Sequence, residues 1–250
     1  SLANEVVGFV QSPIIIDPND TIFLALIAPF SIGLLINSKQ LFSRTLAACS
    51  FTLSLFIIIA VESRSGLLAI FMTSIISVSG FQFRRAVLLL TGLLLLVLLL
   101  DFSLGFPILQ KIPVIPSSRI PLWQAALEMF NTHPFLGMGP FTFGPFYQQY
   151  LLLSEIPEWI TVDFRFIPWP HNLYLELLSG SGIIGISTFL FLLSVTSRNL
   201  ILAWKKLDDG AKFMIPILAS SLIGFLVASM IELSFMRIWV LVFFFSILGL

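Results

Sequence analysis

Charged side chains are scarce in this sequence. Only 10% of its 250 residues are Asp, Glu, Lys or Arg, whereas 58% are hydrophobic. A soluble domain carries roughly 25% charged residues, so this composition cannot provide a water-exposed surface. The mean hydropathy of +1.04 is that of a membrane protein. The thirteen acidic and thirteen basic residues give a net charge of zero, which argues against nucleic acid as a partner.

Residues that bind metal ions or form disulfides are also few. Cys49 is the single cysteine, so the chain has no internal disulfide. The two histidines, His133 and His171, lie too far apart in the sequence for zinc-ligand spacing. No glycine-rich loop of the nucleotide-binding type is present. We therefore expect no metal ion, no cofactor and no nucleotide-sugar donor.

Long apolar runs are what the sequence has in abundance. A helix that crosses a hydrocarbon core of roughly 30 Å needs about 17–25 apolar residues. Seven runs approach or reach that length, at residues 21–37, 45–61, 66–80, 86–104, 173–197, 213–231 and 236–250. They predict an all-α, polytopic transmembrane helix bundle of about seven spans in a single membrane domain, residues 1–250. Because the segment before Asp20 is acidic and carries no signal peptide, we expect the chain to be the C-terminal part of a longer protein.

Basic residues in the short connections predict the orientation of these spans. Eight of the thirteen lie in one set of connections: Lys39, Arg44, Arg84, Arg85, Arg198, Lys205, Lys206 and Lys212. The other set holds five, against eleven of the thirteen acidic residues. The positive-inside rule makes the first set cytoplasmic, so the turn at Arg64 and the large loop 105–172 face outward.

The loop 105–172 contains a predicted helix. Ser117 and Ser118 are residue types that cap helix starts, and an apolar stripe then recurs at helical spacing in Ile120, Trp123, Leu127 and Phe130. Such a stripe is suited to lying on the membrane surface, and we expect the helix to end between Asn131 and Pro134. The Gly-Pro-rich stretch 137–146 predicts turns after it.

Three motifs occur in order along the predicted outer face. Arg64-Ser65-Gly66 opens a membrane helix, and Arg119 leads through Trp123 into the stretch 133–139, His-Pro-Phe-Leu-Gly-Met-Gly. Finally, His171-Asn172 runs into Gly182-Ile183-Ile184-Gly185. This ordered set, which extends over nearly the whole chain, resembles the O-antigen ligase and O-antigen polymerase superfamily of bacterial inner-membrane glycosyltransferases.

The resemblance implies metal-independent transfer of a glycan from a polyprenyl diphosphate carrier, such as undecaprenyl diphosphate, to an acceptor hydroxyl on the periplasmic face. In ligases of lipopolysaccharide biosynthesis the acceptor is a lipid A–core sugar. In polysaccharide polymerases it is another carrier-linked repeat unit, and related members glycosylate proteins. These residues leave the three acceptor types open, together with the sugars and the oligomeric state.

Two arginines fit the charge that develops on a diphosphate leaving group. Arg64 and Arg119 keep their charge and can donate bidentate hydrogen bonds to phosphate oxygens. Arg119 would also lie near a helix N-terminus, where free N–H groups attract phosphate. The alternative reading is structural: Arg64 snorkels at a helix end, and Arg119 contacts lipid headgroups.

The acceptor hydroxyl needs a base, and His171 is the candidate because imidazole can take a proton near neutral pH. The alternative is a loop histidine that bonds only to backbone groups. His133 is better explained as a helix-end residue, and Asn172 as a helix cap. Weaker candidates that could orient an arginine or the imidazole, or contact phosphate or sugar, are Glu62, Arg165 and Glu176.

A transporter of a small anion such as bicarbonate is the main alternative function. Transporters usually place ionisable residues or broken helices near the bilayer midplane. Here Asp101, Glu176 and Glu232 all lie at the ends of apolar runs. That distribution favours chemistry at the membrane surface, and a non-catalytic scaffold would leave the two arginines and the histidine without a shared purpose.

Overall fold

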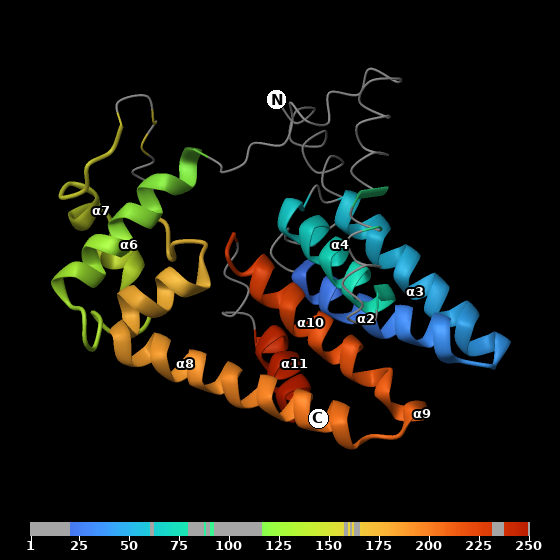
Figure 1. Ribbon diagram of the computed structural model, residues 1–250. Helices are drawn as coiled ribbons and strands as arrows, with labels where there is room; N and C mark the ends of the chain where they lie inside the picture. Colours follow the sequence, from blue (N-terminus) through green and yellow to red (C-terminus); the bar gives the residue numbers. More distant parts are fainter. Residues whose placement is uncertain are drawn as a thin grey trace, which may run out of the picture.

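The fold is all-helical, as predicted. The computed structural model describes residues 21–60, 63–79, 88, 91–92, 117–157, 160, 162, 166–231 and 238–249, and every element assigned in these ranges is a helix (Figure 1). Most of the predicted span 86–104 and the first part of the loop, residues 105–116, lie outside them.

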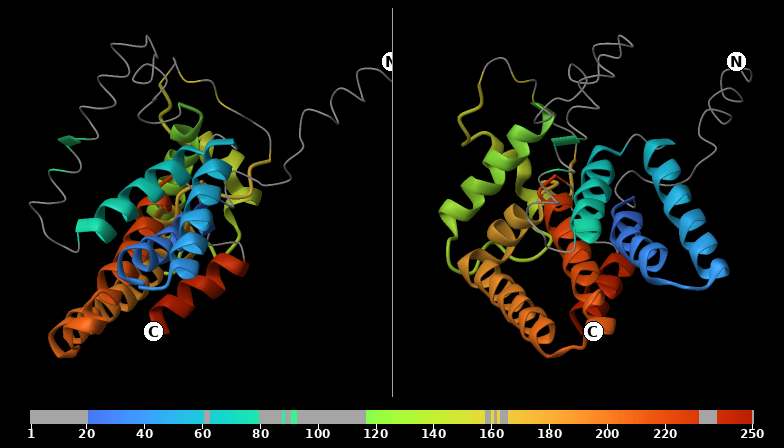
Figure 2. Two further views of the ribbon diagram at one scale, coloured as in Figure 1. Left: turned by 90° about the vertical axis from the view of Figure 1, so that its right-hand side faces the viewer. Right: turned by 45° about the vertical axis from the view of Figure 1, so that its right-hand side comes forward.

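Four helices form a bundle. α2 (Thr21–Asn37), α4 (Arg64–Ser79) and α10 (Met214–Ala228) pack against one another, and α3 (Leu41–Ala60) packs on α2 (Figure 1 and Figure 2). Small residues allow this close approach: a Cβ atom added to Gly224 of α10 would overlap the side chain of Thr73 in α4. Helix contacts through glycine, serine and threonine are typical of membrane proteins.

Hydroxyl pairs fix the register of this bundle. Ser77 of α4 and Ser220 of α10 lie 2.7 Å apart, Oγ to Oγ. Because Gly224 contacts Thr73 one turn earlier in α4, the two helices run antiparallel. Continued to its end, this register places the start of α4 level with the end of α10, where Ser229 caps that helix.

α8 (Leu173–Lys206), the longest helix among the described residues, begins next to Ser229 at the end of α10. The amide of Leu173 donates to the carbonyl of Ser229, 2.9 Å away. α8 breaks at Gly182, whose φ of 62° and ψ of −159° are not helical. Residues 173–181 pack on α6, and residues 183–206 continue as an apolar helix toward α9 (Asp209–Lys212), with α11 (Ile238–Gly249) alongside (Figure 1).

Two helices are long and apolar enough to cross a membrane, α8 and the segment Leu41–Ile58 of α3. The other apolar helices among the described residues are shorter, including Thr21–Asn37, Met214–Ala228 and Val240–Gly249. The helical ranges agree with six of the seven predicted runs, but the number of spans stays a prediction.

The second half of the predicted loop is a compact helical unit. It consists of the 3₁₀ turn η2 (Ser117–Arg119), α6 (Ile120–Thr132) and α7 (Phe143–Leu151). These helices share a buried core of Leu122, Ala125, Ala126, Met129, Phe143, Tyr147, Tyr150 and Leu151. A helix therefore lies where the sequence predicted one, but its buried face is not the stripe seen in the sequence. Its placement on the membrane surface stays a prediction.

Two details of the loop prediction are wrong. Arg119, rather than a serine, is the N-cap residue of α6, and its side chain makes no capping hydrogen bond. The Gly144-Pro145 pair lies within α7 and not in a turn. Pro145 falls in the first turn of that helix, where a missing backbone N–H costs nothing.

Candidate functional site

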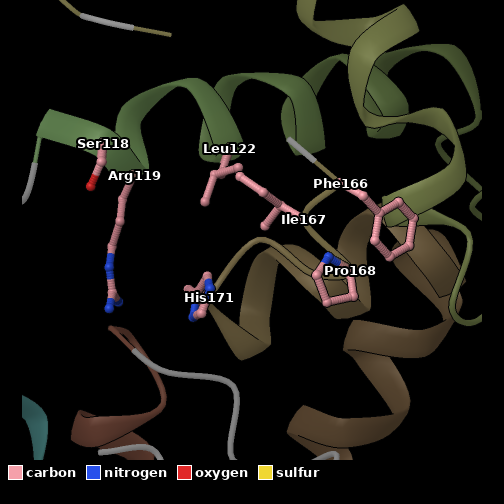
Figure 3. Close-up of a pocket in the computed structure, with 7 residues that line it drawn as sticks. All are labelled: Ser118, Arg119, Leu122, Phe166, Ile167, Pro168 and His171. Carbon is pink, nitrogen blue, oxygen red and sulfur yellow. The ribbon is translucent and has the colours of Figure 1, made fainter. Parts of the chain in front are cut away.

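A pocket of about 410 Å³ brings together two of the predicted site residues. It is lined by Ser118, Arg119, Leu122, Phe166, Ile167, Pro168 and His171. The side chain of Arg119 extends from the start of α6 to the level of the His171 imidazole, and both border the same open space (Figure 3). Two of the three motifs thus each contribute a residue to this pocket.

The pocket lies at the N-terminal ends of two helices. Arg119 is the N-cap residue of α6, and His171 directly precedes the N-cap residue of α8. The N-terminus of a helix carries a partial positive charge of roughly half an elementary charge. Together with the guanidinium group, these two helix ends make the pocket suitable for an anion.

The backbone of His171 has an uncommon conformation. Its φ of 51° is in the left-handed region, which few residues other than glycine adopt. The neighbours hold it there, because the indole Nε1 of Trp123 donates to the carbonyl oxygen of Pro170 at 3.1 Å. The ring of Trp169 meets the imidazole edge-on, with centroids 6.3 Å apart. Such local strain at a fixed position is frequent at functional sites.

Asn172 caps α8, as predicted. Its Oδ1 accepts hydrogen bonds from the amides of Tyr174 and Leu175, at 2.9 and 3.1 Å. Its Nδ2 donates to the carbonyl of Met230, 2.9 Å away, just beyond α10. The cap therefore fixes the residue after His171 both to its own helix and to the central bundle.

Arg64 opens α4 at the same end of the bundle. The Oγ of Ser63 accepts from the amide of Gly66 (3.2 Å) and from the Oγ1 of Thr21 (2.6 Å), so Ser63 is the cap that starts this helix. The register of α4 and α10 brings this start to the level of Ser229, where α8 begins. The side chain of Arg64 lies outside the described residues, and its contact with the pocket stays a prediction.

Of the remaining candidates, Glu176 and His133 are described, and neither lines the pocket. Glu176, in the first turn of α8, is 7% exposed, and its Oε2 has no hydrogen-bond partner in the described part of the chain. His133 ends α6 as predicted, with Nδ1 3.0 Å from the Oγ1 of Thr132. Glu62 and Arg165 lie outside the described residues. The supporting roles of both glutamates and Arg165 are still predictions.

Sequence reasoning missed the apolar wall of the pocket. Leu122, Phe166 and Ile167 line it, but isolated apolar residues in an apolar chain give no signal. Pro168 could have been found, because Pro168-Trp169-Pro170 is a rigid stretch next to His171. Among the residues that the structure describes, no three His, Cys, Asp or Glu side chains are grouped so that they could hold a metal ion.

The break in α8 is filled by another part of the chain, residues 134–139, which we call the interlock. In an unbroken helix the amides of residues 183 and 184 would bond to the carbonyls of residues 179 and 180. Here those carbonyls accept from the interlock, and those amides donate to it. The four bonds are Met138 N to Ser179 O (2.9 Å), Gly139 N to Gly180 O (2.9 Å), Ile183 N to Pro134 O (2.8 Å) and Ile184 N to Phe135 O (3.3 Å).

Glycines make this arrangement sterically possible. A Cβ atom on Gly182 would overlap the carbonyl of Phe135, and one on Gly137 would overlap the backbone of Gly180. Both glycines also have φ above 60°, where an L side chain is strained. The interlock thus joins the C-terminal ends of α6 and of the first part of α8, while their N-terminal ends meet at the pocket.

Comparison with known proteins identifies the family. No curated protein sequence matches the chain. The family model described as O-antigen ligase matches residues 48–190, more than half of the sequence, from α3 through the pocket and the interlock into α8. The expected relation to the O-antigen ligase and polymerase superfamily is confirmed, and the chain belongs to the O-antigen ligase family.

Proposed function

We propose that this protein is a glycosyltransferase that moves a glycan from a polyprenyl diphosphate carrier to an acceptor hydroxyl at the outer face of the inner membrane. The observation that carries the proposal is the pocket that Arg119 and His171 share. A phosphate-binding cation and a proton acceptor on one pocket suit a reaction that releases a diphosphate and deprotonates a hydroxyl. Membership of the O-antigen ligase family supports the same reaction.

Arg119 has the role of stabilising the leaving group. As the bond between the anomeric carbon and the phosphate oxygen breaks, negative charge grows on the diphosphate. A guanidinium donates two parallel hydrogen bonds to phosphate oxygens, and the N-terminal ends of α6 and α8 add positive potential. We assign Arg64 to the second phosphate, because α4 begins at the same end of the bundle.

His171 has the role of general base. Its imidazole accepts the proton of the acceptor hydroxyl, whose oxygen attacks the anomeric carbon. One carbon–oxygen bond forms while the bond to the diphosphate breaks, and the proton leaves on His171. The hydrogen bond from Trp123 to Pro170 and the cap at Asn172 keep this imidazole in place.

The acceptor remains open within this proposal. A lipid A–core sugar, a carrier-linked repeat unit and a protein side chain would all present a hydroxyl group to the base. Anion transport has no support from the family match. The pocket lies at helix ends and not midway along α8, where a transport site would be expected.

The test is glycan transfer by the protein in liposomes that contain a polyprenyl diphosphate-linked oligosaccharide and each candidate acceptor. We expect His171→Ala to lower the transfer rate by about 10²–10⁴-fold, the usual contribution of a general base, while carrier binding is retained. His133→Ala is the matched control and should keep wild-type activity. A His171→Ala variant as active as wild type, or a wild type that neither transfers glycan nor binds the carrier, contradicts the proposal.

A further inference from the structure

The interlock presents a large apolar surface beside α8. Phe135 and Leu136 are 72% and 73% exposed, and Ile183 and Ile184 of α8 are 45% and 53% exposed. Backbone hydrogen bonds from Ile183 to Pro134 and from Ile184 to Phe135 place the four side chains on adjoining backbone. We call these four residues the anchor patch. The sequence has no charged residue from Pro134 to Phe146.

The position of the anchor patch along α8 can be compared with the thickness of a bilayer. α8 ends in Lys205 and Lys206, a basic pair that marks the cytoplasmic boundary in the predicted orientation. From Gly182 to Lys205 the helix rises roughly 35 Å at 1.5 Å per residue, close to a hydrocarbon core of about 30 Å. Arg198, predicted above to be cytoplasmic, is the one charged residue between them. It is near enough to the basic end for its side chain to reach the cytoplasmic boundary by snorkelling.

This comparison puts the anchor patch at the opposite edge of the hydrocarbon core. An irregular backbone is tolerated at that depth only when its polar groups are paired within the protein. The break in α8 meets this condition, because the four hydrogen bonds with the interlock occupy the amides of Ile183 and Ile184 and the carbonyls of Ser179 and Gly180. Phe191, farther along the same helix, is 70% exposed, so the patch continues an exposed apolar face of this helix.

We propose that the anchor patch inserts into the acyl-chain region of the outer leaflet and thereby sets the height of the pocket above the membrane. α6 and residues 173–181 connect the patch rigidly to Arg119 and His171, because the two helices are joined at one end by the interlock and at the other by the bond from Trp123 to Pro170. The carrier's diphosphate is held at headgroup level by its own lipid chain. A fixed height of the pocket therefore matters for a membrane-bound donor. This effect on the donor rests on the proposed function.

The depth of the patch is measured without any assay of activity. A nitroxide is attached to Leu136→Cys in a Cys49→Ala background, and its collisions with oxygen and with a water-soluble nickel chelate are compared in liposomes. Phe191→Cys provides a lipid reference, and Gln149→Cys, an exposed position on α7, provides a water reference. We expect position 136 to favour oxygen over the chelate, as position 191 does. Free collision with the chelate, or protection from both reagents because protein covers the patch, overturns the proposal.

The effect on the site is measured with two donors. Leu136→Asp places a charge in the anchor patch, and Gln149→Asp adds the same charge to an exposed polar position of the same unit. For a long-chain polyprenyl donor in liposomes, we expect Leu136→Asp to raise KM at least tenfold with little change in kcat. For a short, water-soluble analogue of the donor, both variants should match wild type. If Leu136→Asp loses the same activity with both donors, the variant has a folding defect, and this result counts against the height-setting role. If the wild type has no transferase activity, the proposed function is refuted, but the measured depth of the patch still stands.

Discussion

The indole N–H of Trp123 donates a hydrogen bond to the carbonyl oxygen of Pro170, 3.1 Å away. Trp123 stands one turn after Arg119 on α6, and Pro170 directly precedes His171. This one bond therefore joins the helix that begins at Arg119, the proposed phosphate-binding cation, to the backbone of His171, the proposed base.

Trp123→Phe removes this donor and keeps most of the apolar ring. We expect the free energy of unfolding to fall by about 1 kcal/mol, the usual net contribution of one hydrogen bond. We expect kcat to fall even at a temperature where the variant is fully folded, because the backbone of His171 is no longer held by this bond. Thermal unfolding and initial rates of glycan transfer on the same preparations give the two quantities.

Trp204→Phe, at the far end of α8, is the matched control for loss of an indole. If Trp123→Phe keeps wild-type kcat at a temperature where it is fully folded, the bond has no part in positioning the base.

Arg119→Lys retains the charge at the pocket but not the planar pair of donors. Because a lysine ammonium cannot reproduce the bidentate geometry, we expect kcat/KM for the polyprenyl diphosphate donor to fall by roughly ten- to a hundredfold, or about 1.4–2.7 kcal/mol of transition-state stabilisation. Arg198→Lys is the matched control. Arg198 lies on α8 beyond the break at Gly182, so this variant should leave kcat/KM unchanged. Near-normal kcat/KM in Arg119→Lys would remove this residue from the diphosphate site.

We expect glycan transfer to need no divalent cation, because the sequence has no metal-ligand spacing. Since the leaving group is assigned to guanidinium groups, glycan transfer should continue at the same rate after exhaustive treatment with EDTA. Restoration of a lost rate by Mg²⁺ or Mn²⁺ would show that a divalent cation carries the charge instead.

Local chemistry made several features predictable from the sequence. Asn172 precedes a long apolar run, and the cap it forms depends only on the next three residues. The run itself requires a helix, because an apolar segment of that length must satisfy its backbone polar groups internally. Arg119 and His171 were singled out as candidates by chemistry and by their order among the motifs.

Tertiary contacts decided what the sequence pattern missed. The stretch Ser179-Gly180-Ser181-Gly182 is of a kind found at helix kinks, but it does not tell which segment of the chain fills the break. The break exists because residues 134–139 provide alternative hydrogen-bond partners from elsewhere in the chain. Likewise, Gly144 and Pro145 favour a turn by themselves, but packing of Phe143 and Tyr147 in the core with α6 keeps residues 143–151 helical.

Gly182→Ala tests the interlock itself. The new Cβ would overlap the carbonyl of Phe135, and alanine is strained at a φ of 62°. We expect the free energy of unfolding to fall by about 1–3 kcal/mol, the range for a residue held in a sparsely populated backbone conformation. Gly249→Ala is the control for a glycine substitution, because a Cβ added to Gly249 meets no atom within 4 Å. Its free energy of unfolding should equal that of wild type within experimental error. Denaturation of both variants in the same detergent gives the comparison. If Gly182→Ala is as stable as wild type, the close contact between Gly182 and the carbonyl of Phe135 does not matter for stability, and neither does the hydrogen bond from Ile183 to Pro134 beside it.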